Sequence, residues 1–144
     1  MDIQIEERHI EGLQVIIRCP EENTQIHRLQ AHIALFDSRL QAKCNGRTCF
    51  VNTGDVLYFE SVDDRTFLYT ADAVLEIAQR LYALEGMLSK QDFLRISKSQ
   101  IVNIQKIRTL HPELNRTITA TLCNGERLTI SRKYVPHLKQ LLSL

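Results

Sequence analysis

From about residue 42 onward the sequence alternates apolar and polar residues with a period of two, and turn-forming residues interrupt this alternation at short intervals. A period of two sends successive side chains to opposite faces of a strand, so one face is expected to be buried. The clearest pair of segments is Thr117 to Leu122 and Arg127 to Ser131, joined through Asn124-Gly125. The pattern predicts a β-dominated fold of short antiparallel strands.

Three segments carry apolar residues at helical spacing instead. The first follows Pro20 and runs over about residues 21–40, with an apolar stripe at Ile26, Leu29, Ile33, Phe36 and Leu40. The other two, at about 78–88 and 132–142, interrupt the predicted strands. We therefore expect an all-β class of fold with short helices.

The first 18 residues contain two short strand-like pieces, 3–5 and 13–17, separated by Glu11-Gly12. These pieces predict a hairpin ahead of the first helix. A chain of 144 residues has room for one domain of about 100 residues and a short appendage. We expect residues 1–41 to form a hairpin-helix extension, used for packing or dimerisation, and residues 42–144 to form the β domain.

The net charge of +1 hides a strong asymmetry along the chain. Residues 1–94 carry 9 Lys and Arg against 15 Asp and Glu, a net charge of −6, whereas residues 95–144 carry 9 against 2, a net charge of +7. The second part is therefore a candidate surface for binding phosphates. The simpler alternative is a basic face that only contacts solvent.

Other classes of protein find little support in the sequence. Its start has no apolar stretch of the kind that a signal peptide needs, and no run is long enough to span a membrane, so we expect a cytoplasmic protein. The cysteines and histidines do not group at zinc-ligand spacing, and common catalytic and nucleotide-binding motifs are missing. We expect no metal, cofactor, catalytic residue or small-molecule substrate.

We also expect reduced thiols. If Asn45-Gly46 forms a two-residue turn, Cys44 lies opposite Arg47 and Cys49 opposite Ala42, so the two thiols are not directly paired across the strands.

Two segments, FLRISKSQIVNIQKI at 93–107 and LTISRKYVPHLKQLL at 128–142, resemble the most recognisable parts of the LytTR family of bacterial DNA-binding domains. Residues 55–61 and 81–88 are similar to an upstream strand and helix of that family, so the resemblance covers about residues 42–143. The matching residues are Arg95, Ser99, Ile101, Val102 and Asn103 in the first segment and Ser131 and Arg132 in the second.

The resemblance implies small antiparallel sheets whose connecting loops, together with the start of the last helix, enter successive major grooves of double-stranded DNA. Three contact regions are implied: the loop after the strand at 55–61, the loop before the strand that contains Val102 and Asn103, and the start of the last helix. The implied DNA-binding residues are Arg65 and Thr66 in the first region, Arg95, Ser97 and Lys98 in the second, and Ser131, Arg132 and Lys133 in the third. An arginine can present two donors to guanine O6 and N7, and a lysine can reach a base edge or a phosphate.

Each of these residues has an alternative role. Arg132 could bridge to a nearby carboxylate, and Lys98 could be an ordinary surface lysine. In the first region, Asp63 and Asp64 would repel phosphates. We expect Asn103 to be a buried, hydrogen-bonded scaffold residue rather than a base reader, and Glu60 and Glu85 to be structural.

The extension at 1–41 is too short for a phosphoacceptor receiver domain, and it resembles the extension of stand-alone LytTR regulators. That resemblance implies a small membrane protein as an inhibitory partner. The apolar stripe of the first helix could form a homodimer that binds repeated half-sites, or it could pack within one chain. A protein-protein interaction module that acts without nucleic acid is the main alternative function, and RNA binding is a third.

Overall fold

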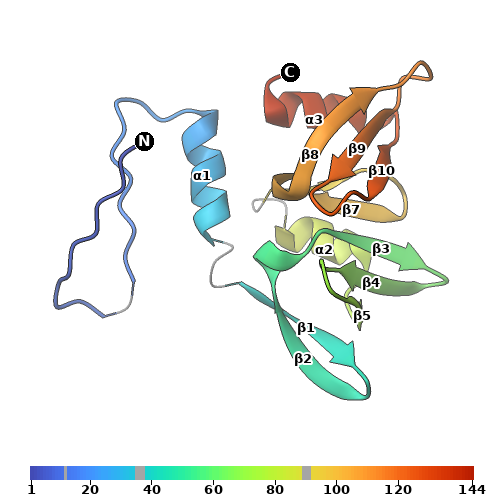
Figure 1. Cartoon of the computed structure of the whole chain (residues 1–144), viewed down its shortest axis with the longest axis horizontal. Coiled ribbons are helices and arrows are strands. Elements are labelled where there is room, and N and C mark those ends of the chain that lie inside the picture. Colours follow the sequence, from blue (N-terminus) through green and yellow to red (C-terminus); the bar gives the residue numbers. More distant parts are fainter. Residues whose placement is uncertain (12, 35–37, 89–91) are drawn as a thin grey trace.

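A computed structural model describes residues 1–11, 13–34, 38–88 and 92–144 (Figure 1). These residues form a seven-stranded antiparallel sheet of order β2-β1-β5-β4-β3-β7-β6 and a three-stranded antiparallel sheet of order β10-β9-β8. This architecture confirms the predicted β-dominated fold with short helices. The elements are α1 (Thr24–Ala34), β1 (Arg39–Cys44), β2 (Arg47–Asn52), η2 (Thr53–Asp55), β3 (Tyr58–Val62), β4 (Arg65–Tyr69), β5 (Val74–Ile77), α2 (Leu81–Leu88), β6 (Phe93–Arg95), β7 (Gln100–Asn103), η3 (Ile104–Lys106), β8 (Ile107–Pro112), β9 (Ile118–Leu122), β10 (Arg127–Ile130) and α3 (Val135–Leu142).

The larger sheet separates two hydrophobic cores. On one face Phe59 of β3 packs with Leu84 of α2. On the other face its neighbour Tyr58 packs with residues of the smaller sheet and with Leu138 of α3. Because alternate residues of the central strands enter opposite cores, these strands are buried on both faces. Helix α2 therefore covers one side of the sheet, while β8, β9, β10 and α3 cover the other.

The turns that join the strands follow the sequence closely. Asn45 and Gly46 have φ values of 50° and 76°, the left-handed conformation that a two-residue hairpin turn requires. The register confirms that Cys44 faces Arg47 and that Cys49 faces Ala42. The strand pair β9–β10 is also as predicted. Its buried residues are Ile118, Ala120, Leu122, Leu128 and Ile130.

The predicted strands of the N-terminal hairpin are wrong. Residues 3–5 and 13–17 adopt no strand, and Gly12 of the expected turn lies outside the described residues. An isolated pair of strands is marginal in water, and in Figure 1 this segment lies on the side of α1 away from both sheets. With nothing covering them, the apolar residues of these two pieces remain mostly exposed.

The predicted boundaries of the first helix are wrong at both ends. Helix α1 begins at Thr24, after Asn23, whose Oδ1 accepts a hydrogen bond from the Ile26 N–H at 3.1 Å. The helix ends at Ala34, and Phe36 of the predicted stripe lies outside the described residues. Leu40 belongs to β1, where it pairs with Val51, so the larger sheet begins at Arg39.

The last two helices begin later than their sequence pattern indicates. Helix α2 begins at Leu81 instead of residue 78, and α3 begins at Val135 instead of residue 132. Arg132 and Lys133 therefore occupy a turn that precedes α3, held by a hydrogen bond from the Tyr134 N–H to the Ser131 carbonyl at 2.8 Å. In that turn the two cations are not part of the first helical turn, so their unfavourable interaction with the helix dipole is reduced.

Candidate nucleic-acid interface

Two of the three predicted contact regions meet through the backbone. The loop between β6 and β7 is closed by a hydrogen bond from the Ile96 N–H to the Gln100 carbonyl at 3.0 Å. The carbonyl of Ile96 accepts a hydrogen bond from the Ser131 N–H at 2.8 Å. The Ser97-Lys98 loop and the turn that begins at Ser131 are therefore neighbours on one surface.

The first predicted region also lies beside this loop, but its turn carries acidic side chains instead of basic ones. The Ser61 N–H of β3 donates to the Ser99 carbonyl at 2.9 Å, and the β3–β4 turn follows immediately. Asp63 and Asp64 form that turn with φ values of 50° and 62°. The turn therefore presents two carboxylates, which repel phosphates.

Arg65 and Thr66 belong to strand β4 rather than to a loop. Arg65 binds Glu76 of β5 through two hydrogen bonds of 3.1 and 2.6 Å, and the hydrogen bond from Arg65 lowers the pKa of Glu76. Thr66 is only 5% exposed. The guanidinium of Arg65 is therefore already occupied by a carboxylate, and Thr66 has almost no surface to offer a base.

Arg95 supports the loop that follows it. Its Nε donates to the Ser97 carbonyl at 2.7 Å, and another guanidinium nitrogen donates to the Lys98 carbonyl. A third nitrogen forms an ion pair with Glu85 of α2 at 2.9 Å. With its side chain 18% exposed, Arg95 uses its donors within the protein and holds the loop in place.

The exposed cations on this surface are Lys98, Arg132 and Lys133. In the described part of the chain, the side chains of Lys98 and Arg132 have no hydrogen bond or ion pair, so the carboxylate bridge considered for Arg132 does not form. The ammonium of Lys133 lies 5.5 Å from the centre of the Tyr134 ring. Ser97 and Ser131 are half-buried between these cations and the core. The arrangement leaves at least two positive charges free to meet an anion.

Asn103 is buried and fully engaged, as predicted. Its amide nitrogen donates to the Val56 carbonyl at 2.9 Å, and its oxygen accepts from the Gln105 N–H at 3.0 Å. Glu60 is also structural, since it accepts hydrogen bonds from Tyr69 and Gln100. These residues position β3 and β7, the strands that carry the contact loop, and leave no free group for base reading.

The larger sheet is joined to the smaller one through Tyr58, which belongs to an aromatic pair. The rings of Tyr58 and Tyr69 stack with centroids 4.2 Å apart. The Tyr58 hydroxyl donates to Glu126 of the β9–β10 turn at 2.7 Å, and burial, followed by this carboxylate, raises the pKa of Tyr58 strongly. The contact fixes the smaller sheet, and with it the Ser131 turn, relative to β3.

Arg116 belongs to the same end of the smaller sheet and was not predicted from the sequence. The register pairs Ile118 with Ile130, so the β8–β9 turn that contains Arg116 lies at the end of β10 where Ser131 follows. Arg116 is exposed and has a φ of 70°. Its place in the basic half was a signal, but only the strand pairing shows which end of the sheet it occupies.

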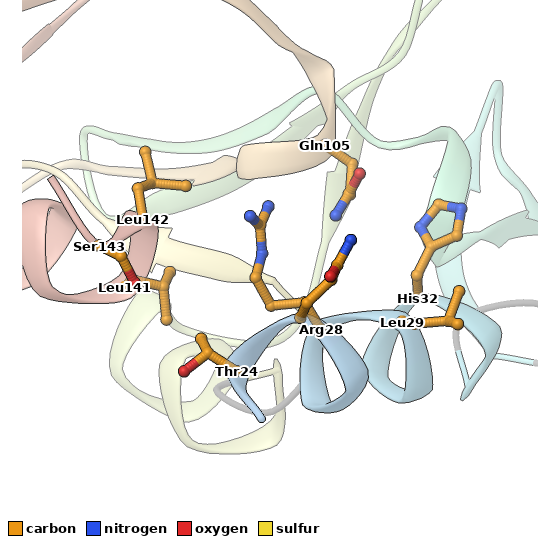
Figure 2. Close-up of a pocket in the computed structure, with 9 residues that line it drawn as sticks. Thr24, Arg28, Leu29, His32, Gln105, Leu141, Leu142 and Ser143 are labelled. Atoms are coloured by element: carbon orange, nitrogen blue, oxygen red, sulfur yellow. The ribbon is translucent and has the colours of Figure 1, made fainter. Parts of the chain in front are cut away.

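A separate pocket of about 350 Å³ lies between α1 and the end of α3 (Figure 2). Arg28 reaches into it from α1, with its Nε 3.9 Å from the carboxylate of Asp92, which also accepts a hydrogen bond from Gln105. The Arg28–Asp92 ion pair therefore links α1 to the domain beside this pocket. Among the residues described, no group of three or more His, Cys, Asp or Glu side chains could hold a metal ion, and no helix is long and apolar enough to cross a membrane.

Comparison with known proteins shows that the part of the chain that carries this surface matches a known protein family. The model of the LytTr DNA-binding domain family matches residues 46–143. The LytTr DNA-binding domain of a Bacillus cereus protein has a solved structure that superimposes with a TM-score of 0.71 at 27% sequence identity, covering 75% of this chain and 99% of that domain.

Two curated relatives have a similar sequence over 94 residues, which is 65% of this chain. The sensory transduction protein LytT of Bacillus subtilis is 30% identical, and a Staphylococcus aureus protein named as an HTH-type transcriptional regulator is 35% identical. The matches span 39% and 63% of the lengths of these two relatives.

Proposed function

Because this chain belongs to the family of LytTr DNA-binding domains, we propose that it regulates transcription by binding double-stranded DNA in a sequence-specific way. This family is a DNA-binding one and not a family of enzymes. The observation that carries the proposal is the 2.8 Å hydrogen bond between Ser131 and Ile96, because it brings two loops with exposed cations onto one surface. The net charge of +7 after residue 94 supports the same assignment.

In the proposed complex, the β6–β7 loop and the turn before α3 enter the same major groove, because they adjoin at Ser131 and Ile96 whereas successive major grooves are about 34 Å apart. Arg132 offers its guanidinium fork to a guanine, while Lys98 and Lys133 contact phosphates or base edges. The hydroxyls of Ser97 and Ser131 donate to phosphate oxygens. Helix α3 buries Leu138 in the core and serves to support the turn that precedes it.

The remaining predicted site residues take other roles in this proposal. Arg95 positions the β6–β7 loop, and Arg65 remains paired with Glu76. Thr66 stays in the sheet. Arg116 joins the surface as an additional phosphate contact, because its turn lies beside Ser131. The contact surface is thus centred on the second and third regions.

We also propose that residues 1–41 bring two copies together, so that two domains bind repeated half-sites in the cytoplasm. Ile26, Leu29 and Ile33 of α1 are only half-buried against the single chain, which supports a further contact.

A small membrane protein that restrains the regulator is a second proposed partner, suggested by the resemblance to stand-alone regulators. Co-purification of such a protein with the chain from membranes tests this partner.

The test of DNA binding is enrichment of random oligonucleotides with the purified full chain, followed by a salt titration on the selected duplex. We expect a defined motif and a logarithm of the binding constant that falls linearly with the logarithm of the salt concentration, with a slope of about 0.9 per phosphate contact. A scrambled duplex of equal length is the control. Equal affinity for both duplexes would contradict sequence-specific regulation, and no affinity for either duplex would favour a protein-protein module.

A further inference from the structure

The N-terminal arm (residues 1–22) carries apolar side chains that nothing covers. In the described part of the arm, the backbone makes a single hydrogen bond within the chain, from the Ile10 N–H to the Arg8 carbonyl. Its side chains alternate in a strand-like period although no strand forms. The exposed residues are Ile3 at 77%, Ile5 at 91%, Ile10 at 52%, Leu13 at 79%, Val15 at 53% and Ile16 at 65%.

The edge strand β2 has backbone N–H and C=O groups on its outer side that no strand among the described residues pairs with. Strand β2 is the last strand on its side of the larger sheet. The two-residue turn and the register of β1–β2 direct the N–H groups of residues 47, 49 and 51 toward β1, and those of Thr48, Phe50 and Asn52 outward. Exposed edges of this kind attract another strand and are usually protected.

Apolar surface accompanies this open edge. Phe50 is 60% exposed, and it lines a groove of about 610 Å³ whose walls contain Val51 and Leu75 together with charged residues such as Arg39 and Asp72. An added strand formed by residues 13–17 would set Leu13, Val15 and Ile17 in line with Cys49 and Val51, which already pack on the core. Its other face would place Ile16 beside Phe50.

The net charges of the arm and of the β1–β2 hairpin are opposite in sign. The arm carries six acidic residues and two basic ones, a net charge of −4. The β1–β2 hairpin (residues 39–52) carries Arg39, Lys43 and Arg47 and no acidic residue, a net charge of +3. Two arms would repel each other, whereas the arm and the hairpin attract each other.

We propose that the N-terminal arm of one copy adds as a strand to the β2 edge of a second copy and forms a reciprocal dimer. The occupant is a second copy because α1 separates the arm from the sheets of its own chain in Figure 1. Exchange of identical segments of this kind is a common route to dimers. The inference rests on the dimer part of the proposed function and specifies its contact.

The first test compares Thr48→Pro with Thr48→Ala in the full chain by sedimentation velocity. The proline removes an outward N–H and leaves the ladder with β1 in place, so we expect the dimer dissociation constant to rise at least tenfold, while the alanine variant stays within about threefold. Arg47→Glu should also weaken the dimer. A monomeric wild-type chain at 100 micromolar, or a dimer that Thr48→Pro leaves unchanged, would overturn the proposal.

Hydrogen exchange supplies a second measurement that does not depend on a variant. In the wild-type chain we expect the amides of Phe50 and Asn52 and those of residues 13–17 to gain protection together as concentration rises. A dimer that requires the arm but leaves Phe50 unprotected would mean arm-to-arm pairing and overturn the inference. Binding of the wild-type chain to a single half-site duplex is measured in parallel. If the chain forms the dimer but does not bind this duplex, the DNA-binding proposal alone fails.

Discussion

The backbone N–H of Ser131 donates to the carbonyl oxygen of Ile96 across a distance of 2.8 Å. Ile96 is fully buried and begins the β6–β7 loop, while Ser131 begins the turn ahead of α3. This single contact makes one surface from two segments that are distant in the sequence. The exposed cation Arg132 follows Ser131 directly, and the exposed cation Lys98 lies two residues after Ile96.

Replacement of Arg132 by alanine is expected to weaken binding of the selected duplex by about 1–3 kcal/mol and to relax preference at one base pair, because a bidentate base contact is lost. Lys98→Ala should weaken all sequences alike and reduce the salt slope by about 0.9. Fluorescence anisotropy on matched and singly substituted duplexes measures both. Arg127→Ala removes an exposed charge at the opposite end of β10 and is the control, and equal losses for all three variants would refute the contact surface.

Arg95→Ala is expected to weaken DNA binding by roughly 1–2 kcal/mol, the size of one or two lost hydrogen bonds to a charged group. The salt slope should not change, because Arg95 positions the Ser97-Lys98 loop and touches no phosphate. Faster hydrogen exchange in residues 96–99 should accompany the loss. Arg95→Lys should not rescue binding, since a single ammonium cannot reach the three acceptors together. A slope that falls by about one would instead make Arg95 a phosphate contact.

Asn103→Leu is expected to destabilise the domain, because the Val56 carbonyl would lose its partner in the core and the part-buried Gln105 N–H would lose its acceptor. Each unsatisfied group costs about 1–3 kcal/mol of unfolding free energy. Urea denaturation followed by circular dichroism measures the change. Asn124→Ala removes an exposed turn amide and should cost under about 1 kcal/mol. A similar cost for both variants would argue against the scaffold role of Asn103.

The Arg65–Glu76 pair should make stability depend on pH in the acid range. The hydrogen bond from Arg65 lowers the pKa of Glu76 below its ordinary value of 4.5, so the unfolded chain binds its proton first as the pH falls. The stabilisation is complete above the ordinary pKa and is lost as the pH falls through the lower, folded value. Glu76→Gln should therefore flatten the stability profile below about pH 4.5. An unchanged acid slope in thermal melts would contradict this assignment.

Local structure could be predicted where neighbouring residues determine it. Asn45-Gly46 predicted both a turn and a register, because few residue pairs tolerate two successive positive φ angles. The alternation in β9 and β10 predicted their buried faces for a similar reason. Asn103 was predicted to be buried because a polar residue between apolar strand residues must find partners inside.

Predictions were weaker where distant contacts decide the outcome. Leu40 continues the helical stripe of α1 in the sequence, yet its pairing with Val51 places it in a strand. Strand signals in the N-terminal arm did not produce strands, because no partner among the described residues of the same chain covers them. Arg65 and Arg95 are predicted DNA contacts from the sequence, and only the structure shows that their donors bind Glu76 and Glu85 within the chain.

The class of fold, the turns and the family resemblance follow from the amino-acid sequence alone, since these depend on residues that are close in the chain and on repeated patterns. Contacts between distant elements establish which cations are free. A guanidinium that faces a carboxylate from another element is used internally, whereas one beside backbone groups alone stays available to an anion. Hydrogen bonds such as that between Ser131 and Ile96 join residues far apart in the chain, and no local pattern specifies them.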